Sequence, residues 1–192
     1  MQVEVPILNP GKKKYELKAG IISVVDSSGK EVFHAKIRRG RGSYRVTSHT
    51  RRINGIRETS LQESDCEDAE VVYSKLLRIL DGKLIVGVEL EEDFNSMDLE
   101  IGHFKVFDLQ WYYYRLTYSI NHKPIIEKLG IRSLCMHFFN VDMQGDDKPH
   151  DCCIDAQYSV RLFLEVYCKI SPAPETKDCN LEGTNFIEHF KK

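Results

Sequence analysis

The sequence lacks the features that mark several large classes of protein. No stretch approaches the roughly 18 uninterrupted apolar residues of a membrane-spanning helix, so we expect no membrane association. The N-terminus has no apolar run like that of a secretory signal peptide, and we therefore expect an intracellular protein, nuclear or cytoplasmic. Internal repeats and low-complexity segments are also absent, which favours a single globular domain.

Cysteine pairs with metal-ligand spacing are missing too. The chain has six cysteines, but none forms a Cys-x2-Cys pair, and the spacing does not suggest a zinc site. In an intracellular protein we expect reduced thiols that are mostly buried. For the adjacent Cys152 and Cys153, packing at a helix start is favoured over a catalytic or redox role.

No charge of either sign dominates the chain. The formal net charge of −2 excludes a protein that binds nucleic acid through a uniformly basic surface, but it leaves room for local patches. A length of 192 residues, with 42% apolar and 29% charged residues, is typical of one soluble domain with a full core. We expect this domain to span residues 1–171, followed by a polar tail, 172–192, that is either mobile or docked.

The apolar pattern predicts a mixed α/β fold. The expected strands form a three-strand meander and two further strands, at residues 3–6, 21–25, 32–37, 84–88 and 103–107. The expected helices lie between the cap-type residues 64–68 and Asp81, at 91–99, 125–129 and 133–139, and from 151 to about 170. This order implies a mixed central sheet with helices on both sides.

Three acidic residues and one histidine stand in a distinctive order along the chain. Gln2-Val3-Glu4 opens the chain, Asp93 follows the apolar run 84–88, and His150 stands five residues before Asp155. In order and spacing these residues resemble the DEDDh 3′→5′ exonucleases, whose pattern is D-x-E, then D, then H-x4-D. Here Gln2 stands in place of the first Asp.

Further segments extend the resemblance to the small RNA-processing branch of that family, which includes the interferon-induced exonuclease. Segments 50–56, 84–94 and 150–156 are similar to the family's "TRVSGV", "LVGHDLKHDF" and "HSSVEDA". Residues 107–108 and 132–134 fall where the family has "YDT" and "SLR". The resemblance runs from about residue 2 to residue 170 and implies an RNase H-like fold.

The resemblance also implies a role for each matching residue. Glu4, Asp93 and Asp155 would be the carboxylate ligands of two Mg²⁺ or Mn²⁺ ions, because closely spaced dications need several carboxylates. His150 would be the general base that takes a proton from the attacking water.

Gln2 stands at the position whose carboxylate binds both ions in the family. A neutral amide cannot offset two dications, so we expect weak metal occupancy and an impaired or inactive site. Two more departures point the same way: Val88 stands where the family has His, and Asp151 adds an acid beside His150. In a degenerate site, the four matching residues would be remnants that still fit.

A basic stretch lies between residues 36 and 57, where eight of the 27 basic residues occur without an intervening acid. Arginines of this kind contact phosphates, and interleaved aromatic residues such as Tyr44 stack on bases. The alternative is a solvated loop that balances the acidic segment 63–68. The candidate nucleic-acid-binding residues are Arg38, Arg39, Arg41, Arg45, Arg51 and Arg52.

Two other features keep the functional alternatives open. The aromatic run 111–114 can stack on bases, pack in the core or form a protein-interaction surface. Acidic residues crowd segment 89–93 and would repel RNA phosphate if metals bind poorly. The sequence favours an exonuclease-like protein that binds single-stranded RNA, a pseudo-exonuclease. The alternatives are a protein–protein interaction module, with a protein partner or as a homodimer, and a weakly active metal-dependent 3′→5′ exoribonuclease.

Overall fold

A computed structural model describes residues 1–7, 15–143, 145 and 149–170 of the chain. The strands are β1 (Gln2–Pro6), β2 (Tyr15–Ala19), β3 (Ile21–Val25), β4 (Glu31–Ile37), β5 (Cys66–Glu67), β6 (Leu84–Gly87), β7 (Lys105–Asp108), β8 (Tyr114–Tyr118) and β9 (Pro124–Lys128). The helices are α1 (Ser48–Asn54), α2 (Ala69–Leu80), α3 (Leu90–Ser96), α4 (Ile131–Phe139), α5 (Cys152–Arg161) and α6 (Cys168–Ile170). The expected tail, 172–192, lies outside the described residues.

The strands pair in both senses, and the β3–β4–β5 sheet is itself mixed. Backbone hydrogen bonds connect the described strands in four groups, β1–β2, β3–β4–β5, β6–β7 and β8–β9. The β4–β5 and β6–β7 pairs are parallel, whereas β1–β2, β3–β4 and β8–β9 are antiparallel. All five expected strands are present within two residues of their predicted bounds.

The meander contains a bend, at Gly20, that the apolar pattern did not predict. A single residue, Gly20, separates β2 from β3, so that β1 pairs with the first half of a bent strand and β4 with the second. The main chain of Gly20 bonds to Met1 O on one side (2.8 Å) and to Ile37 N on the other (2.8 Å). A Cβ at Gly20 would lie 3.1 Å from Leu61 Cδ1, so the bend leaves little room for a side chain.

Two apolar clusters hold the helices against the strands. In the first, Ala35 and Ile37 of β4 pack with Val72 and Leu76 of α2. Val72 and Leu76 are four residues apart and therefore lie on the same face of α2. The second joins β7 to α4 and to the helical segment that follows residue 151. Within the described ranges, no helix has the length and apolarity needed to cross a membrane.

The helix predicted from residue 151 to about 170 is present, with an internal irregularity. It comprises α5, a π-helical stretch η3 (Leu162–Tyr167) and α6. Asp151 begins it, since its side chain accepts hydrogen bonds from Cys153 N (2.8 Å) and Ile154 N (3.3 Å).

The aromatic run 111–114 divides between core and surface. The Tyr112 ring stacks on Phe107, with ring centroids 4.4 Å apart, and Tyr113 is buried. Trp111 ends the 3₁₀ turn η2 (Leu109–Trp111) and is 55% exposed. Core packing therefore accounts for Tyr112 and Tyr113, while Trp111 remains available at the surface.

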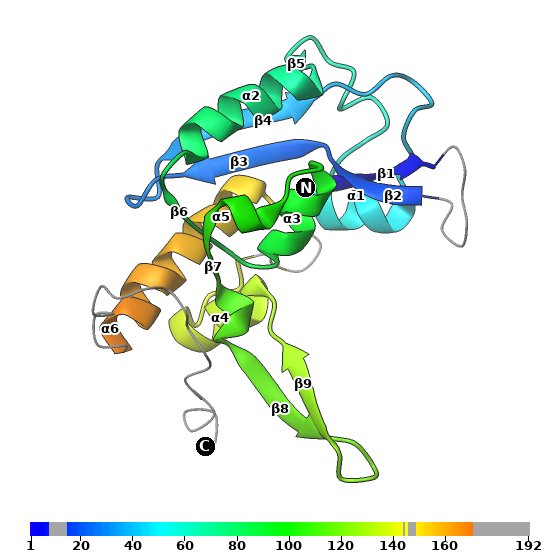
Figure 1. The fold of residues 1–192 in the computed structure, drawn as a ribbon. Coiled ribbons are helices and arrows are strands. Elements are labelled where there is room, and N and C mark those ends of the chain that lie inside the picture. Colours follow the sequence, from blue (N-terminus) through cyan, green and yellow to red (C-terminus); the bar gives the residue numbers. More distant parts are fainter. Residues whose placement is uncertain (8–14, 144, 146–148, 171–192) are drawn as a thin grey trace.

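The predicted helix at residues 125–129 is wrong. Residues 124–128 form β9, which pairs with β8 in a hairpin that extends away from the rest of the domain (Figure 1). The β-branched Ile125 and Ile126 favour a strand, and Ile126 lies opposite Leu116. The short apolar run suggested a helix, but hydrogen bonding to β8, whose Leu116 lies 10 residues before Ile126, makes this segment a strand.

The five cysteines within the described ranges are free thiols, and Cys66 and Cys135 are buried. Burial raises the pKa of Cys152 to about 11, so its thiolate is disfavoured at neutral pH. Cys152 is half-buried at the start of α5.

Candidate nuclease-like site and nucleic-acid interface

The residues of the exonuclease-like pattern come from three elements. Gln2 and Glu4 lie two positions apart on β1, Asp93 lies on α3, and Asp155 lies on α5 with His150 just before that helix. The fold brings Gln2 to α3: its amide nitrogen donates to Glu92 O (3.2 Å) and to Asp93 Oδ1 (3.4 Å). The expected neighbourhood of residues 2 and 93 is therefore present, with an amide N–H facing the carboxylate.

His150 and Asp155 form a second pair. His150 Nδ1 lies 3.5 Å from Asp155 Oδ2, and both side chains are about one-third exposed. The backbone N–H of His150 donates to Ile53 O at the end of α1 (2.6 Å). The histidine is thus held between α1 and α5.

Glu4 lies beside the basic stretch. Its backbone oxygen accepts from Arg45 N (2.8 Å), and its carboxylate Oε2 lies 3.9 Å from Arg45 Nε. The Arg45 guanidinium also lies over the Tyr15 ring, 5.3 Å from the centroid. A residue predicted to bind nucleic acid therefore adjoins a residue predicted to bind metal.

The surroundings of Asp93 disfavour its ionised form. Asp93 is exposed as a residue, but neighbouring atoms shield its carboxyl group from water. This desolvation raises the pKa of Asp93. The nearby Glu89 and Asp108 raise this pKa further, while the hydrogen bond from Gln2 opposes the shift.

The residues present do not fit a two-metal centre. Two adjacent dications need several carboxylates between and around them. Across the described part of the chain, no three His, Cys, Asp or Glu side chains lie close enough together to hold a metal ion. Gln2 presents an N–H donor to Asp93, and Glu4 lies beside Arg45, so cationic or donor groups of the protein stand next to these carboxylates.

The predicted nucleic-acid-binding arginines fall into two groups. Arg38 donates to Cys66 O and pairs with Asp68 (3.4 Å), and Arg39 donates to Ala19 O (2.8 Å), so these two side chains brace the strands. The other four are exposed, and they are Arg41, Arg45, Arg51 and Arg52. Arg38 is exposed as well but pairs with Asp68, whereas Arg39 is half-buried, so Arg41, Arg45, Arg51 and Arg52 are the main candidates for phosphate contacts.

Helix α1, which carries Arg51 and Arg52, lies in a segment for which no helix was predicted. Thr47 begins it, since the hydroxyl oxygen accepts from Thr50 N (3.0 Å). Gly55 ends it in the left-handed conformation with a φ of 68°, as glycine readily does. The two arginines occupy the last turn, where the helix dipole favours positive charge.

Asn54 ties α1 to the first strand and was not recognised from the sequence as a site residue. Its amide nitrogen donates to the main-chain oxygen of Gln2 (2.9 Å), and its amide oxygen accepts from Ile56 N (3.1 Å). A Cβ at Gly55 would lie 3.0 Å from Pro149, so the chain preceding His150 packs closely on this turn. The Asn-Gly pair at the end of segment 50–55 is the sequence signal that could have identified it.

A buried carboxylate positions the helix that carries Asp93. Asp108 is 3% exposed and accepts from three backbone N–H groups, Glu89 (3.3 Å), Leu90 (2.9 Å) and Gln110 (2.9 Å). Glu89 adopts a left-handed φ of 61° directly before α3, and Gln110 Nε2 donates to its carboxylate (3.1 Å). Asp108 therefore holds a conformation that is unfavourable for a non-glycine residue.

We expect the Asp108→Ala variant to lose about 3 kcal/mol or more of unfolding free energy, because three backbone N–H groups lose their acceptor. Urea unfolding followed by circular dichroism measures this loss. The matched control is Asp65→Ala, which removes an exposed acid paired with Lys36 and should cost less than about 1 kcal/mol. Equal losses in the two variants would contradict the role assigned to Asp108.

In comparisons with known proteins, the chain is similar to nucleases. No protein-family model matches the chain. The chain is similar to RNA exonuclease 4 of Homo sapiens, with 25% identity over 166 residues, covering 86% of this chain and 36% of the relative. It is also similar to small RNA degrading nuclease 2 of Arabidopsis thaliana, with 22% identity over 115 residues, covering 59% of this chain and 24% of the relative.

Solved structures identify the fold. The pseudoubiquitin hydrolase–RNA exonuclease module of Saccharomyces cerevisiae Pan2, in complex with AAUUAA RNA, matches with a TM-score of 0.67 and 16% identity, covering 90% of this chain and 29% of that one. The catalytic unit of Neurospora crassa Pan2 matches with a TM-score of 0.59 and 18% identity, covering 77% of this chain and 24% of that one.

The chain therefore has the RNase H-like fold of exonuclease domains, which confirms the predicted fold class. Its sequence is similar to proteins named as RNA nucleases. The chain spans 36% of the length of the human relative, so the likeness concerns one part of that protein.

Proposed function

We propose that this protein is an RNA-binding relative of the DEDDh exonucleases, of the small RNA-processing branch, with an impaired or inactive two-metal site. The observation that carries the proposal is the Gln2 amide, which faces the Asp93 carboxylate where the family pattern has an acid (3.4 Å). A neutral amide in this place brings no negative charge of its own, and its N–H group hydrogen-bonds to the Asp93 carboxylate, so the attraction for a dication is weaker.

The remaining site contacts support the same reading. Glu4 lies beside Arg45, and His150 lies beside Asp155, so each implied metal carboxylate has a donor or a cation of the protein near it. The Arg45–Glu4 contact is long and partly exposed, so the free energy of this ion pair is small. We expect Mg²⁺ or Mn²⁺ to occupy this site weakly.

The exposed arginines support single-stranded RNA as the partner. Arg51 and Arg52 project from α1, whose Asn54 is bonded to β1, and Arg45 lies beside Glu4. The basic surface therefore borders the exonuclease-like site. In this position it can guide an RNA strand toward that site. The Pan2 module that shares this fold was solved with RNA.

The test is the salt dependence of RNA binding. If Arg41, Arg45, Arg51 and Arg52 contact phosphates, the slope of log K against log salt for a single-stranded RNA should be roughly −3, since each contact contributes about −0.7. Fluorescence anisotropy with a labelled oligonucleotide gives this slope, and a double-stranded RNA of the same length is the comparison. A slope near zero, or no binding at low salt, would refute the RNA-binding proposal.

A second candidate function is a protein-interaction module, with a partner protein or as a homodimer. The β8–β9 hairpin favours it, because Tyr118 is 64% exposed, Ile126 is 65% exposed and Ile120 is 98% exposed. Large exposed apolar residues that gather in this way mark interaction surfaces. Absence of RNA binding, together with a dimeric mass in light scattering, would favour this candidate over the first.

A further inference from the structure

The β8–β9 hairpin exposes one whole strand. Every residue of β9 is exposed, whereas Tyr114, Leu116 and Thr117 of β8 are half-buried. The hairpin extends away from the rest of the domain (Figure 1), and within the described ranges the main chain of β9 bonds to β8 alone. A two-stranded hairpin by itself is marginally stable in water, so a free strand in this position gains stability from a further strand beside it.

The hydrogen bonds of the hairpin determine which main-chain groups of β9 face outward. Ser119 N donates to Lys123 O (2.9 Å), and in an antiparallel pair such bonded positions alternate with non-bonded ones. The odd-numbered residues of β9 therefore bond to β8, and the even-numbered residues direct their main-chain groups to the free edge. These outward-facing residues are Pro124, Ile126 and Lys128. A proline fits there because it has no N–H to contribute to the β8 pairing.

One face of the hairpin is apolar. Leu116 lies opposite Ile126, and Tyr118 lies opposite Pro124, so these four side chains share a face. Ile126 is 65% exposed and Tyr118 is 64% exposed. A second hairpin beside β9 would extend this face over four strands, and a sheet of three or more strands with an apolar face is stable where a lone hairpin is not.

We propose that β9 pairs in the antiparallel sense with β9 of a second copy of this chain, about a twofold axis at Ile126. The Ile126 N–H of each copy donates to the Ile126 C=O of the other, and each Lys128 N–H donates to the other copy's Pro124 C=O. This pairing goes beyond the protein-interaction candidate because it names the partner and the strand, and it leaves the arginines of α1 free to bind RNA.

The register follows from the outward-facing residues of β9. A twofold axis at Pro124 would remove the central N–H donors, and an axis at Lys128 would place two like charges directly opposite each other. With the axis at Ile126, Lys128 lies opposite Pro124 and Glu127 lies opposite Ile125, so no like charges face each other. The β-branched Ile126 side chains then form a cross-strand pair on the apolar face.

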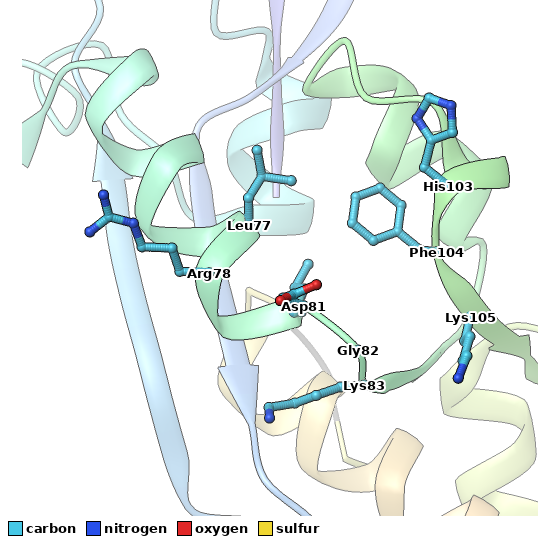
Figure 2. A pocket seen from close by; sticks show the side chains of 9 residues that line it. Leu77, Arg78, Asp81, Gly82, Lys83, His103, Phe104 and Lys105 are labelled. Atoms are coloured by element: carbon cyan, nitrogen blue, oxygen red, sulfur yellow. The ribbon is translucent and has the colours of Figure 1, made fainter.

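A hollow of about 560 Å³ at the end of α2 is less suited to a second copy. Leu77 lines it and is 38% exposed. Figure 2 shows the side chains of Arg78, Lys83 and Lys105 around this hollow pointing away from one another, so two copies that met here would bring like charges together. Leu77 therefore provides a control position, an exposed apolar residue away from the proposed interface.

The test is the mass of the full chain in solution, measured by sedimentation equilibrium from about 1 to 200 µM. The wild type should pass from one chain to two within this range, because pairing of two short strands forms a small interface typical of reversible complexes. Ile126→Lys and Ile126→Glu should each weaken association about tenfold or more, since each places two like charges opposite each other. Leu77→Lys, the control, should associate like the wild type.

An equimolar mixture of Ile126→Lys and Ile126→Glu should regain the mass of two chains, because opposite charges then meet at the twofold axis. Circular dichroism shows that each variant is folded. A wild type that stays a single chain at 200 µM, wild-type association of Ile126→Lys, or failure of the mixture to associate would overturn the proposal. All masses are read without RNA, so failure of this pairing is distinct from failure of RNA binding at α1.

Discussion

RNA shortening by the wild-type protein is expected to be no faster than shortening by the Asp155→Asn variant, in Mg²⁺ or in Mn²⁺. A working two-metal site would lose roughly a thousandfold or more in rate on removal of a ligand, because metal ions contribute several kcal/mol to the transition state. Here Gln2 cannot replace a shared carboxylate, and no three suitable ligands gather within the described residues. The wild-type rate should therefore already lie at background.

The measurement follows a 5′-labelled single-stranded RNA on a denaturing gel with protein in excess. A wild-type rate more than about tenfold above that of Asp155→Asn would show about 1.4 kcal/mol or more of transition-state stabilisation through Asp155, and would contradict an inactive site. His150→Ala serves as a second comparison, because the implied general base acts on the same step.

Restoring the carboxylate supplies the complementary experiment. Gln2→Asp places two acids next to each other, so the variant should be less stable without metal and should gain stability when Mn²⁺ binds. At a free Mn²⁺ concentration of 100 times the dissociation constant, the gain is about 2.7 kcal/mol. The wild type and Gln2→Asn, which lack the added charge, should show no such gain in thermal unfolding. Equal Mn²⁺ stabilisation of wild type and Gln2→Asp would show that the amide does not weaken metal binding.

The second large effect is expected at α1. Arg51→Ala/Arg52→Ala should weaken single-stranded RNA binding by about 10-fold to 100-fold at low salt and should make the salt slope shallower by about 1.4, since two phosphate contacts are lost. Both side chains are exposed, and the loss of two positive charges from the last turn of α1 leaves the Thr47 and Gly55 ends of the helix in place.

Anisotropy titrations at several salt concentrations measure both quantities. Arg115→Ala/Lys128→Ala is the matched control, because it lowers the net charge equally on the distant β8–β9 hairpin. Unchanged affinity in Arg51→Ala/Arg52→Ala, or an equal loss in the control, would show that α1 is not the RNA-binding surface.

The sequence predicted the elements whose signals are local. The continuous apolar run of β6 and the helical spacing after Asp151 both specify their structures without distant partners. The β8–β9 hairpin was missed because its turn residues carry no strong turn signal, and Ile125-Ile126 alone fits either a helix or a strand. Helix α1 was missed because seven residues rich in arginine show no apolar periodicity.

For the candidate site, spacing placed residue 2 near Asp93 and His150 near Asp155, and both proximities are present. The contact between Glu4 and Arg45 could not be foreseen, because it depends on an isolated β-bridge between segments 41 residues apart. The bracing roles of Arg38 and Arg39 likewise depend on which backbone carbonyls the folded chain presents. A basic run in a sequence does not distinguish arginines that bond to the backbone from those that do not.

The bond between Asn54 and residue 2 bears on how such a protein evolves. Asn54 binds the main-chain oxygen of Gln2, a group that every amino acid presents, and makes no use of the side chain there. A substitution at position 2 therefore alters the side chain that faces Asp93 while the anchor of the arginine helix stays intact. In this fold the side chain at position 2 can therefore change without loss of the contact that anchors the arginine helix beside it.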